Sequence, residues 1–555
     1  MKVFQYEWSD LVENSRNMNR RELIRNAAYC AGTTLASLAL EHVALAAAST
    51  SSEASTTTGR VRGSIDRGVH VFKGIPYGAD TALHRFMPAS PAAPWAGIRE
   101  AISFGPRAPQ TSRHDSGDTG YHLPPELGPV SEDCLYLNIW TPALRDGRQR
   151  PVIVYIHGGA YSNGSANNEL YGGVNLCRRG DVVVVTLNHR LNLFGFLYLA
   201  DLAPEFADSG NVGMLDLVLA LQWVQDNIAE FGGDPKRILI FGQSGGGAKC
   251  ATLMGMPAAH GLFHRVITMS GQQITASRRE TATTRTLAVL AALNLPTNRI
   301  EELRAMPMQQ LIQASHAAGY YGPVKDGRTL VRDPFDPDAP PLSANIPMIL
   351  GNTHDETRFL IGSADPTAFQ LTWETLRGKL AQHAQFLGHL NLDEVIRQYR
   401  SIYPAYSPSD VFFAATTASR SWRGQLIEAE KRAVQPTARA VTWVYELDWR
   451  TPVDGGRWGA PHTLDIPLVL DNTAVADGMT GDTPEARRLA RLMSDTWIAF
   501  AQTGNPNHVG LPHWSPYSLS HRETMSFDAQ TQLIDDPRRE ERKLVEQVPY
   551  TQPGT

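Results

Sequence analysis

The sequence has few cysteines, no long apolar run and no excess of charge of one sign, and each absence excludes a class of protein. Four cysteines among 555 residues are too few for a scaffold held together by disulfides. No stretch reaches the roughly 18 consecutive apolar residues that a membrane-spanning helix needs. The net charge is −5 with both signs interspersed, unlike a nucleic-acid-binding surface. We therefore expect no nucleic-acid partner and no stable membrane anchor.

Hydrophobic residues, in contrast, make up 42% of the chain, which is enough for a large globular interior. Length alone would allow several domains, although a large α/β fold can run this long as one unit. The sequence has no internal repeat, and only the Ser/Thr-rich stretch 49–58 has low complexity. We predict a linker over residues 49–58 and a single domain over residues 59–548.

Residues 1–48 differ in composition from the rest. Arg20 and Arg21 precede an alanine-rich apolar segment that ends in small residues before Ser49. Paired arginines, an apolar segment and small residues at A-x-A spacing are typical of an export signal, and the pair resembles a bacterial twin-arginine signal. We expect export to the periplasm or the medium, with Met18 as a candidate start. The alternative is an amphipathic N-terminal helix of the mature protein.

Continuous apolar runs recur through the chain and are typical of strands buried on both faces of a largely parallel sheet. Residues 216–231 lie between two of these runs and carry apolar residues at helical spacing. Alternation of strand and helix predicts an α/β fold with a mostly parallel sheet covered on both faces. The runs are residues 152–156, 182–187, 238–241, 266–269, 348–350 and 441–445.

Three further segments complete the predicted architecture. Residues 59–78 alternate apolar and polar residues between glycines, which predicts a small antiparallel meander. Residues 132–142 alternate in the same way and predict another strand. Residues from about 360 to 435 are more helical, and we interpret them as a helical cap beside the sheet.

A serine follows the apolar run 238–241 and is flanked by glycines. Gly242-Gln243-Ser244-Gly245-Gly246 matches the G-x-S-x-G nucleophile elbow between a strand and a helix. A serine at such a sharp turn has strained backbone, so neighbours such as Gly242 and Gly246 must lack bulk. The following helix points its N-terminal N–H groups at the serine, where negative charge develops during acyl transfer. The alternative is a glycine-rich surface turn that contains a serine.

Acyl transfer also needs a base, a carboxylate that orients it, and donors for the oxyanion. The loop 157–160, H-G-G-A, follows the run 152–156 and can present backbone N–H groups, with Gly245 as a further donor. Asp355 and Glu356 follow the run 348–350, and on chemistry alone either can be the acid. His462 is a candidate base, and spacing alone leaves open His383, His389, His508, His513 and His521.

Further motifs occur in a specific combination: E-D-C-L-Y-L-N at 132–138, N-H-R at 188–190, F-G-F at 194–196, N-I at 227–228, F-G-G-D-P at 231–235, G-P-V-K-D-G at 322–327 and T-G-N-P at 503–506. With the elbow and the H-G-G loop, the chain from about Gly59 to Phe527 resembles the type-B carboxylesterases, which include cholinesterases and bacterial p-nitrobenzyl esterases. The resemblance implies an α/β-hydrolase fold without metal or organic cofactor. It also implies these roles: nucleophile Ser244, acid Glu356 rather than Asp355, base His462, and oxyanion donors Gly159, Ala160 and Gly245.

Departures from the family pattern carry information. Gln243 replaces the glutamate of many animal members, which removes one attraction for a cationic substrate and argues against a choline ester. Gly245 replaces the commoner alanine, which keeps the N–H and loosens the backbone. Cys134 lacks its family disulfide partner, which would lie near Ala108, and we expect a free, buried thiol. Ser270 matches a serine of the family beside the site, and this match fits a structural role as well as a functional one.

The sequence thus predicts a serine hydrolase that cleaves carboxylic esters through an acyl-enzyme, with a small-molecule ester and water as its partners. The same catalytic parts would serve a hydrolase of a specialised ester, lactone, carbamate or amide. A more remote alternative is a non-catalytic, cholinesterase-like binding protein. Four aromatic residues are candidates for the pocket wall or for the core: Tyr161, Tyr320, Tyr321 and Trp458.

Overall fold

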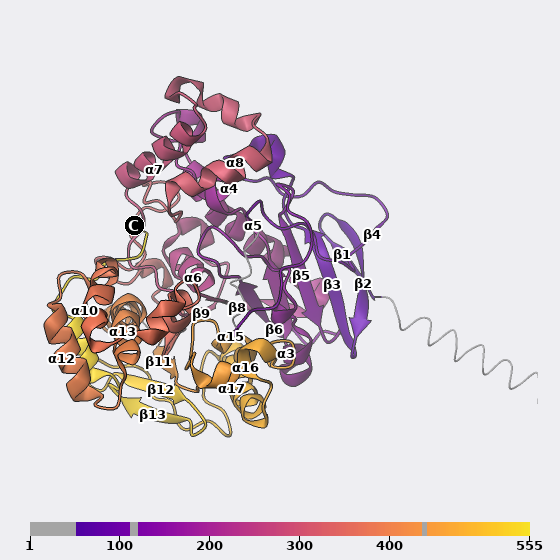
Figure 1. The fold of residues 1–555 in the computed structure, drawn as a ribbon. Coiled ribbons are helices and arrows are strands. Elements are labelled where there is room, and N and C mark those ends of the chain that lie inside the picture. The colour runs from indigo at the N-terminus through magenta and orange to yellow at the C-terminus, as the bar shows by residue number, and fades with distance from the viewer. Residues whose placement is uncertain (1–51, 112–119, 436–440, 555) are drawn as a thin grey trace, which may run out of the picture. The chain divides into compact units, whose positions relative to one another are not determined.

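One sheet of 13 strands organises the computed structural model, which describes residues 52–111, 120–435 and 441–554 (Figure 1). The predicted export signal at residues 1–48 lies outside these ranges. The strands are β1 Ser52–Thr56, β2 Gly59–Asp66, β3 Val69–Pro76, β4 Ile98–Glu100, β5 Tyr136–Thr141, β6 Arg150–Ile156, β7 Val183–Leu187, β8 Gly233–Gln243, β9 Arg265–Met269, β10 Met348–Thr353, β11 Thr442–Leu447, β12 Glu523–Phe527 and β13 Gln532–Asp535.

The strand order is β1-β2-β3-β5-β7-β6-β8-β9-β10-β11-β12-β13, with β4 beside β2. Every neighbouring pair from β7 to β12 is parallel. The pairs β2–β3, β3–β5, β5–β7 and β12–β13 are antiparallel. The mostly parallel sheet and the N-terminal antiparallel meander are therefore confirmed, and the meander continues the main sheet.

The α-helices of the described residues are α3 Val174–Gly180, α4 Asn192–Phe196, α5 Val212–Asn227, α6 Gly245–Gly255, α7 Arg279–Ala292, α8 Met308–Ala314, α9 Glu356–Leu360, α10 Trp373–Ala381, α11 Ala384–Leu387, α12 Leu392–Ile402, α13 Pro408–Thr417, α14 Arg423–Ala433, α15 Asp465–Val469, α16 Asp477–Thr480, α17 Pro484–Thr503 and α18 Arg539–Val545. The helix expected over 216–231 begins four residues earlier, and its end is a 3-10 turn, Ile228–Phe231. None of the helices in the described ranges is long and apolar enough to cross a membrane.

Helices cover both faces of the sheet, and alternate residues of β6 show this directly. Val152, Val154 and Ile156 pack into one core with apolar residues of α5 and α6. Ile153 and Tyr155 belong to a second core on the opposite face, with residues of α3 and α17. Both sets of side chains are buried, because successive residues of a strand point to opposite faces. This explains the continuous apolar runs in the sequence.

The linker predicted over 49–58 is wrong for its central part. Ser52–Thr56 form β1, the edge strand beside β2. Ser52 and Ala54 are buried, since their small side chains face the sheet interior, and threonine favours strands. Serine- and threonine-rich composition is therefore compatible with both a flexible linker and an edge strand, and composition alone did not distinguish them.

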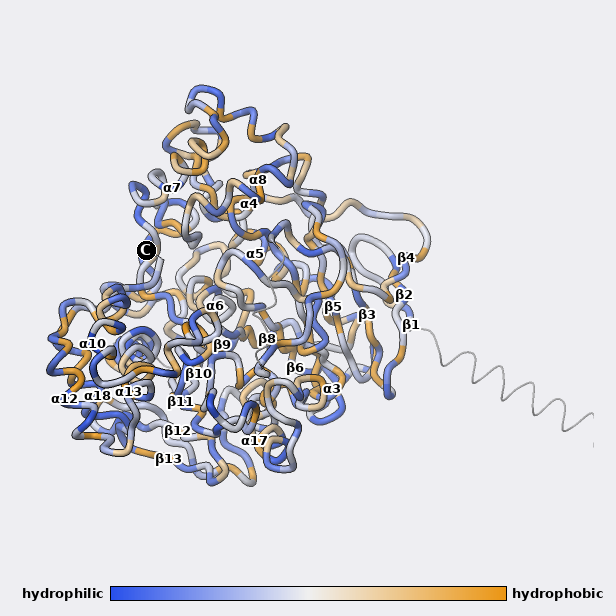
Figure 2. The backbone as a smooth tube through the Cα atoms, in the orientation of Figure 1, coloured by the Kyte–Doolittle hydropathy of each residue, from blue (hydrophilic) through white to orange (hydrophobic). Residues whose placement is uncertain are grey.

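The predicted cap is confirmed as a helical layer with its own core. The helices α10, α12 and α13 enclose apolar residues that include Leu376, Val395 and Phe412. Along α12, hydrophobic and hydrophilic residues alternate (Figure 2), and its buried residues are Val395 and Tyr399. A second helical lobe, α7 and α8, was not predicted, and it lies at the opposite end of the view in Figure 1.

The expectation of a free thiol at Cys134 is confirmed. Cys134 is fully buried and forms no disulfide. Burial raises the pKa of its thiol well above the ordinary value, so the group stays protonated and unreactive. Ala108, where the family partner would stand, is buried as well.

Candidate active site

Ser244 lies at the turn between β8 and α6, as the elbow motif predicts. Its backbone has φ 58° and ψ −127°, which is a rare conformation for a residue with a side chain. Two backbone hydrogen bonds hold the turn: Ser244 N–H to Met269 O at 2.7 Å and Ala248 N–H to Ser244 O at 3.0 Å. A Cβ on Gly246 would lie 2.0 Å from Ile156 O. Glycine is therefore required where the elbow crosses the end of β6.

The H-G-G-A loop packs directly against this elbow. A Cβ on Gly158 would lie 3.3 Å from Ser244 Cβ, and a Cβ on Gly245 would lie 2.2 Å from Ala160 O. Gly159 and Ala160 have positive φ angles of 86° and 52°, which turn the loop over the serine. In the described part of the chain, the N–H groups of Gly159, Ala160 and Gly245 donate to no acceptor. Three unpaired donors thus lie beside Ser244.

Gly245 has a different consequence from the one expected. The sequence suggested that glycine in place of alanine loosens the backbone. In the structure, an alanine Cβ would collide with the backbone of Ala160, so glycine allows the elbow and the loop to approach each other. The close approach places the start of α6 directly against the loop 157–160.

Glu356 and His462 form a buried pair next to the elbow. Glu356 begins α9, three residues after the end of β10, and its Oε2 is hydrogen-bonded to His462 Nδ1. The other oxygen, Oε1, accepts from Thr353 N–H at 3.0 Å and from Asn352 Nδ2 at 3.1 Å. Burial raises the pKa of Glu356, but His462 and the nearby Ser270 hydroxyl outweigh burial and hold that pKa below its ordinary value. The carboxylate therefore stays ionised and faces the imidazole.

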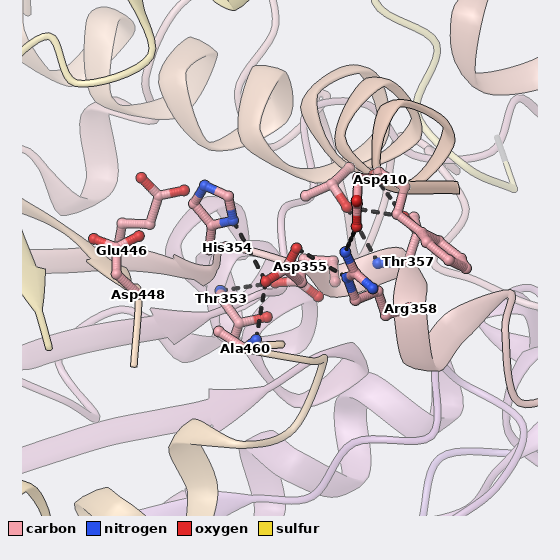
Figure 3. A network of polar contacts seen from close by, with 12 residues as sticks. Thr353, His354, Asp355, Thr357, Arg358, Asp410, Glu446, Asp448 and Ala460 are labelled. Carbon is pink, nitrogen blue, oxygen red and sulfur yellow. Dashed lines mark hydrogen bonds and ion pairs between the residues drawn. The ribbon is translucent and has the colours of Figure 1, made fainter. Parts of the chain in front are cut away.

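Asp355 is the neighbour of Glu356 but serves a different segment (Figure 3). Its N–H donates to Ala460 O at 2.9 Å, and its Oδ2 accepts from Ala460 N–H at 3.0 Å. Its Oδ1 accepts from Arg358 Nε at 3.2 Å. Asp355 thus fastens the chain two residues before His462. Of the two acids that chemistry left open, Glu356 contacts the imidazole and Asp355 holds the loop that carries it.

Gln243 and Ser270 lie on either side of the pair. Gln243 Nε2 lies 3.3 Å from both ring nitrogens of His462. The amide therefore contacts the ring without selecting one of the two nitrogens. Ser270 has φ 52°, and its N–H donates to Gly351 O at 2.6 Å. Within the described residues Ser244 Oγ makes no hydrogen bond to His462; such bonds often form only when substrate is bound.

One cluster near the site has the residue types of a metal centre. His354, Glu446 and Asp448 offer ligand atoms within 4.8 Å of one another, and Figure 3 shows them to one side of Asp355. However, Glu446 already pairs with Arg538 at 3.0 Å. Burial lowers the pKa of His354, but Asp355 and Glu446 raise it to about 9, so the ring carries a proton at neutral pH. The cluster is better described as a partly buried ion-pair network.

Of the four aromatic residues considered for the pocket, Trp458 belongs to the core. It is fully buried and packs against Tyr121, Phe359 and Phe369. Tyr161 directly follows Ala160, and its hydroxyl donates to Gln273 Oε1 at 2.9 Å. The remaining two, Tyr320 and Tyr321, precede Gly322 and lie near Arg285 of α7.

Lys249 is a residue near the site that the sequence reasoning missed. It lies on α6 five residues after Ser244, is fully buried, and its Nζ donates to His157 O at 3.1 Å. Its Nζ also lies 5.7 Å from the centre of the Tyr161 ring. Burial lowers the pKa of Lys249 to about 7. A single lysine inside the apolar helix A-K-C-A-T-L-M was the signal that could have revealed it.

We expect Lys249→Met to stabilise the protein at neutral pH by on the order of 2 kcal/mol, because methionine fills similar space without a buried charge. In the folded state the lysine pKa is about 7 instead of 10.5. The unfolded chain therefore binds more protons than the folded protein. Lys249 destabilises the folded state fully below pH 7, and this destabilisation disappears as the pH rises through 10.5. Calorimetric unfolding at about pH 6, 8 and 10 should show a gain that shrinks with pH. A pH-independent gain, or an equal gain for the exposed control Lys236→Met, would contradict this explanation.

The chain is similar to known proteins over most of its length. Residues 50–545 match the model of the family described as "Carboxylesterase family". The chain is 33% identical over 501 residues to para-nitrobenzyl esterase of Bacillus subtilis, covering 88% of this chain and 97% of that protein. It is 34% identical to phenmedipham hydrolase of Pseudarthrobacter oxydans, with 84% and 92% covered.

A solved structure gives the same result for the fold. The carboxylesterase EST55 of Geobacillus stearothermophilus aligns with a TM-score of 0.78 and 37% identity over 89% of this chain and 99% of that one. The α/β-hydrolase fold implied by the sequence motifs is thereby confirmed. The chain belongs to the carboxylesterase family, and it is a hydrolase of carboxylic esters.

Proposed function

We propose that Ser244, His462 and Glu356 are the catalytic triad of this esterase, and that Gly159, Ala160 and Gly245 supply the oxyanion hole. One observation carries the proposal: a buried carboxylate–imidazole pair lies next to a strained serine turn, against which a loop with unpaired N–H groups packs. Nucleophile, base, orienting acid and anion donors are the groups that acyl transfer requires.

In the proposed mechanism, Ser244 Oγ attacks the ester carbonyl carbon while His462 takes the hydroxyl proton. The carbonyl oxygen becomes an oxyanion that accepts from the three backbone N–H groups, and each such donor is worth about 2.7–4 kcal/mol in the transition state. The alcohol leaves with the proton from His462. Water then attacks the acyl-enzyme by the same route, and the acid is released. Glu356 holds the imidazole tautomer and stabilises its charged form.

We further propose that the preferred esters are uncharged at the alcohol side. Position 243, directly before the nucleophile, is a neutral glutamine whose amide contacts His462. A glutamate there would supply a buried negative charge for a cationic substrate. This part of the proposal rests on position 243 alone.

The proposal is tested with the purified protein and p-nitrophenyl esters of increasing acyl length, followed by labelling with a fluorophosphonate. We expect hydrolysis with one optimum of acyl length, and a single label on Ser244. A label without hydrolysis would favour a specialised ester, lactone, carbamate or amide as substrate. Neither label nor hydrolysis would favour the binding-protein alternative and overturn the proposal.

We also propose that residues 1–48 direct export by a twin-arginine route, as their composition indicates. Fusing this segment to a reporter protein in a bacterial host should place the reporter outside the cytoplasm. Replacing Arg20 and Arg21 by lysines should retain the reporter in the cytoplasm. Export that is unaffected by the lysines would contradict the twin-arginine route.

A further inference from the structure

Residues 272–274 connect the acid of the site to the rest of the fold. Gln272 Nε2 donates to Asn352 Oδ1 at 3.2 Å, and Asn352 Nδ2 donates to Glu356 Oε1 at 3.1 Å. Since the oxygen of the Asn352 amide accepts from Gln272, its NH₂ group must face Glu356. A rotated amide would place two oxygens against each other in a buried site. Gln272 therefore fixes the orientation in which Asn352 supports the carboxylate.

The same short segment contacts the oxyanion side. Gln273 Oε1 accepts from the hydroxyl of Tyr161 at 2.9 Å, and Tyr161 directly follows Ala160. The backbone N–H of Gln273 donates to Glu428 Oε1 at 2.8 Å. Glu428 belongs to α14 and is fully buried, and this burial raises its pKa to about 8. The hydrogen bond therefore joins α14 to residues 272–274. Residues 272–274 thus lie between the Glu356 side and the loop 157–160.

A segment near the end of the chain holds residues 272–274 in place. Gln552 Oε1 accepts from Ile274 N–H at 2.9 Å, and Gln552 Nε2 donates to Gln272 O at 3.1 Å. One buried side chain therefore makes the pair of hydrogen bonds that a neighbouring strand would make. We call residues 550–554, Y-T-Q-P-G, the C-terminal strap.

The strap is itself anchored on both helical lobes. Tyr550 Oη donates to Arg420 O at 3.1 Å, next to α14. Gly554 O accepts from Arg285 Nη2 of α7 at 2.9 Å. A Cβ on Gly554 would lie 2.0 Å from the Tyr320 ring, so the strap fits closely against this ring. Figure 1 shows the C-terminal end between the α7–α8 lobe and the α10–α13 cap.

We propose that the C-terminal strap is a positioning element for catalysis, in which Gln552 orients Glu356 through Gln272 and Asn352. The inference rests on the proposed function, because it takes Glu356 as the acid. Gln552 touches neither substrate nor reacting atoms. Its effect is to keep the Asn352 amide donating to the carboxylate, and therefore to keep the carboxylate aimed at His462.

The test is Gln552→Met, which preserves side-chain length and burial while removing both hydrogen bonds. We expect kcat for a p-nitrophenyl ester to fall about three- to tenfold with KM little changed, since the lost bonds support the transition state and not substrate binding. Thr551→Ala, a change at the exposed neighbouring position, is the matched control and should keep the wild-type kcat. If Gln552→Met does not fold, Gln552→Glu is measured in its place. Glutamate keeps an oxygen for Ile274 N–H and loses the NH₂ group that donates to Gln272 O.

A double-mutant cycle with Asn352→Ala separates positioning from general stability. If Gln552 acts through Asn352, the double variant should lose little more kcat than Asn352→Ala alone. Losses that multiply, or a wild-type kcat in Gln552→Met, would overturn the proposal. Glu356→Gln is measured in parallel: inactivity of that variant beside a fully active Gln552→Met rejects only the strap, whereas full activity of Glu356→Gln rejects the triad.

Discussion

Ser244→Ala is expected to lower kcat by about a millionfold while the protein stays folded. The alanine keeps the Cβ, so the backbone at φ 58° gains no new strain. The unpaired donors of Gly159, Ala160 and Gly245 also remain, and they should leave a residual rate about a thousandfold or more above that of water. Initial-rate measurements on a p-nitrophenyl ester give the loss in kcat and the residual rate over that of water, and calorimetry verifies folding.

Ser270→Ala provides a matched comparison for this loss. Ser270 also follows a parallel strand and also has a positive φ, of 52°, but it lies beside Glu356 and not beside the loop 157–160. Removing its hydroxyl should cost at most about tenfold in kcat, because one hydrogen-bonding group near the carboxylate is lost. Wild-type rates in Ser244→Ala, or a fluorophosphonate label on another residue, would contradict the nucleophile assignment.

The core of the fold could be predicted because parallel strands buried on both faces leave a direct signature. Each of β6, β7 and β10 lies on a continuous apolar run, and its two sets of side chains enter the two cores. The elbow was equally visible, since its glycines are required: a Cβ on Gly246 would lie only 2.0 Å from Ile156 O. Local sequence was sufficient where local sterics decide the structure.

Other features depend on distant partners, and the local sequence left a weak signal or none. β1 has the composition of a linker, and it becomes a strand because it pairs with β2. Lys249 is buried because α6 is covered on all sides, and Gln552 finds its partners about 280 residues away, at Gln272 and Ile274. Tertiary contacts override composition at such positions.

The choice of the orienting acid also could not be made from the local sequence. Asp355 and Glu356 follow the same strand, and neither charge nor spacing distinguishes them. Asp355 is the N-cap of α9, with a non-helical φ of −116° and ψ of 41°, whereas Glu356 is the first residue of the helix. The two side chains therefore leave the backbone in different directions, and one carboxylate faces His462 while the other faces Ala460. Only the resemblance to the carboxylesterases favoured Glu356 in advance.

Glu356→Gln is accordingly expected to lower kcat by about ten-thousandfold with little effect on the fold. The amide oxygen will remain with the donors Thr353 N–H and Asn352 Nδ2, which now bind Oε1. The amide NH₂ group must then face His462 Nδ1 and donate to it. This places the imidazole proton on Nε2, so that nitrogen cannot accept the proton of Ser244.

Asp355→Asn distinguishes this tautomer effect from a simple loss of buried charge. An asparagine can keep an oxygen on Ala460 N–H, and the ion pairs with Arg358 and His354 are weakened. We therefore expect a loss in kcat of about tenfold or less together with a lower Tm, since the loop before His462 is held less firmly and the charge pair with His354 is lost. The two variants differ by one position and remove the same charge. If Asp355→Asn were the more severe in kcat, the orienting acid would be Asp355, and the contact between Glu356 and His462 would have no catalytic role.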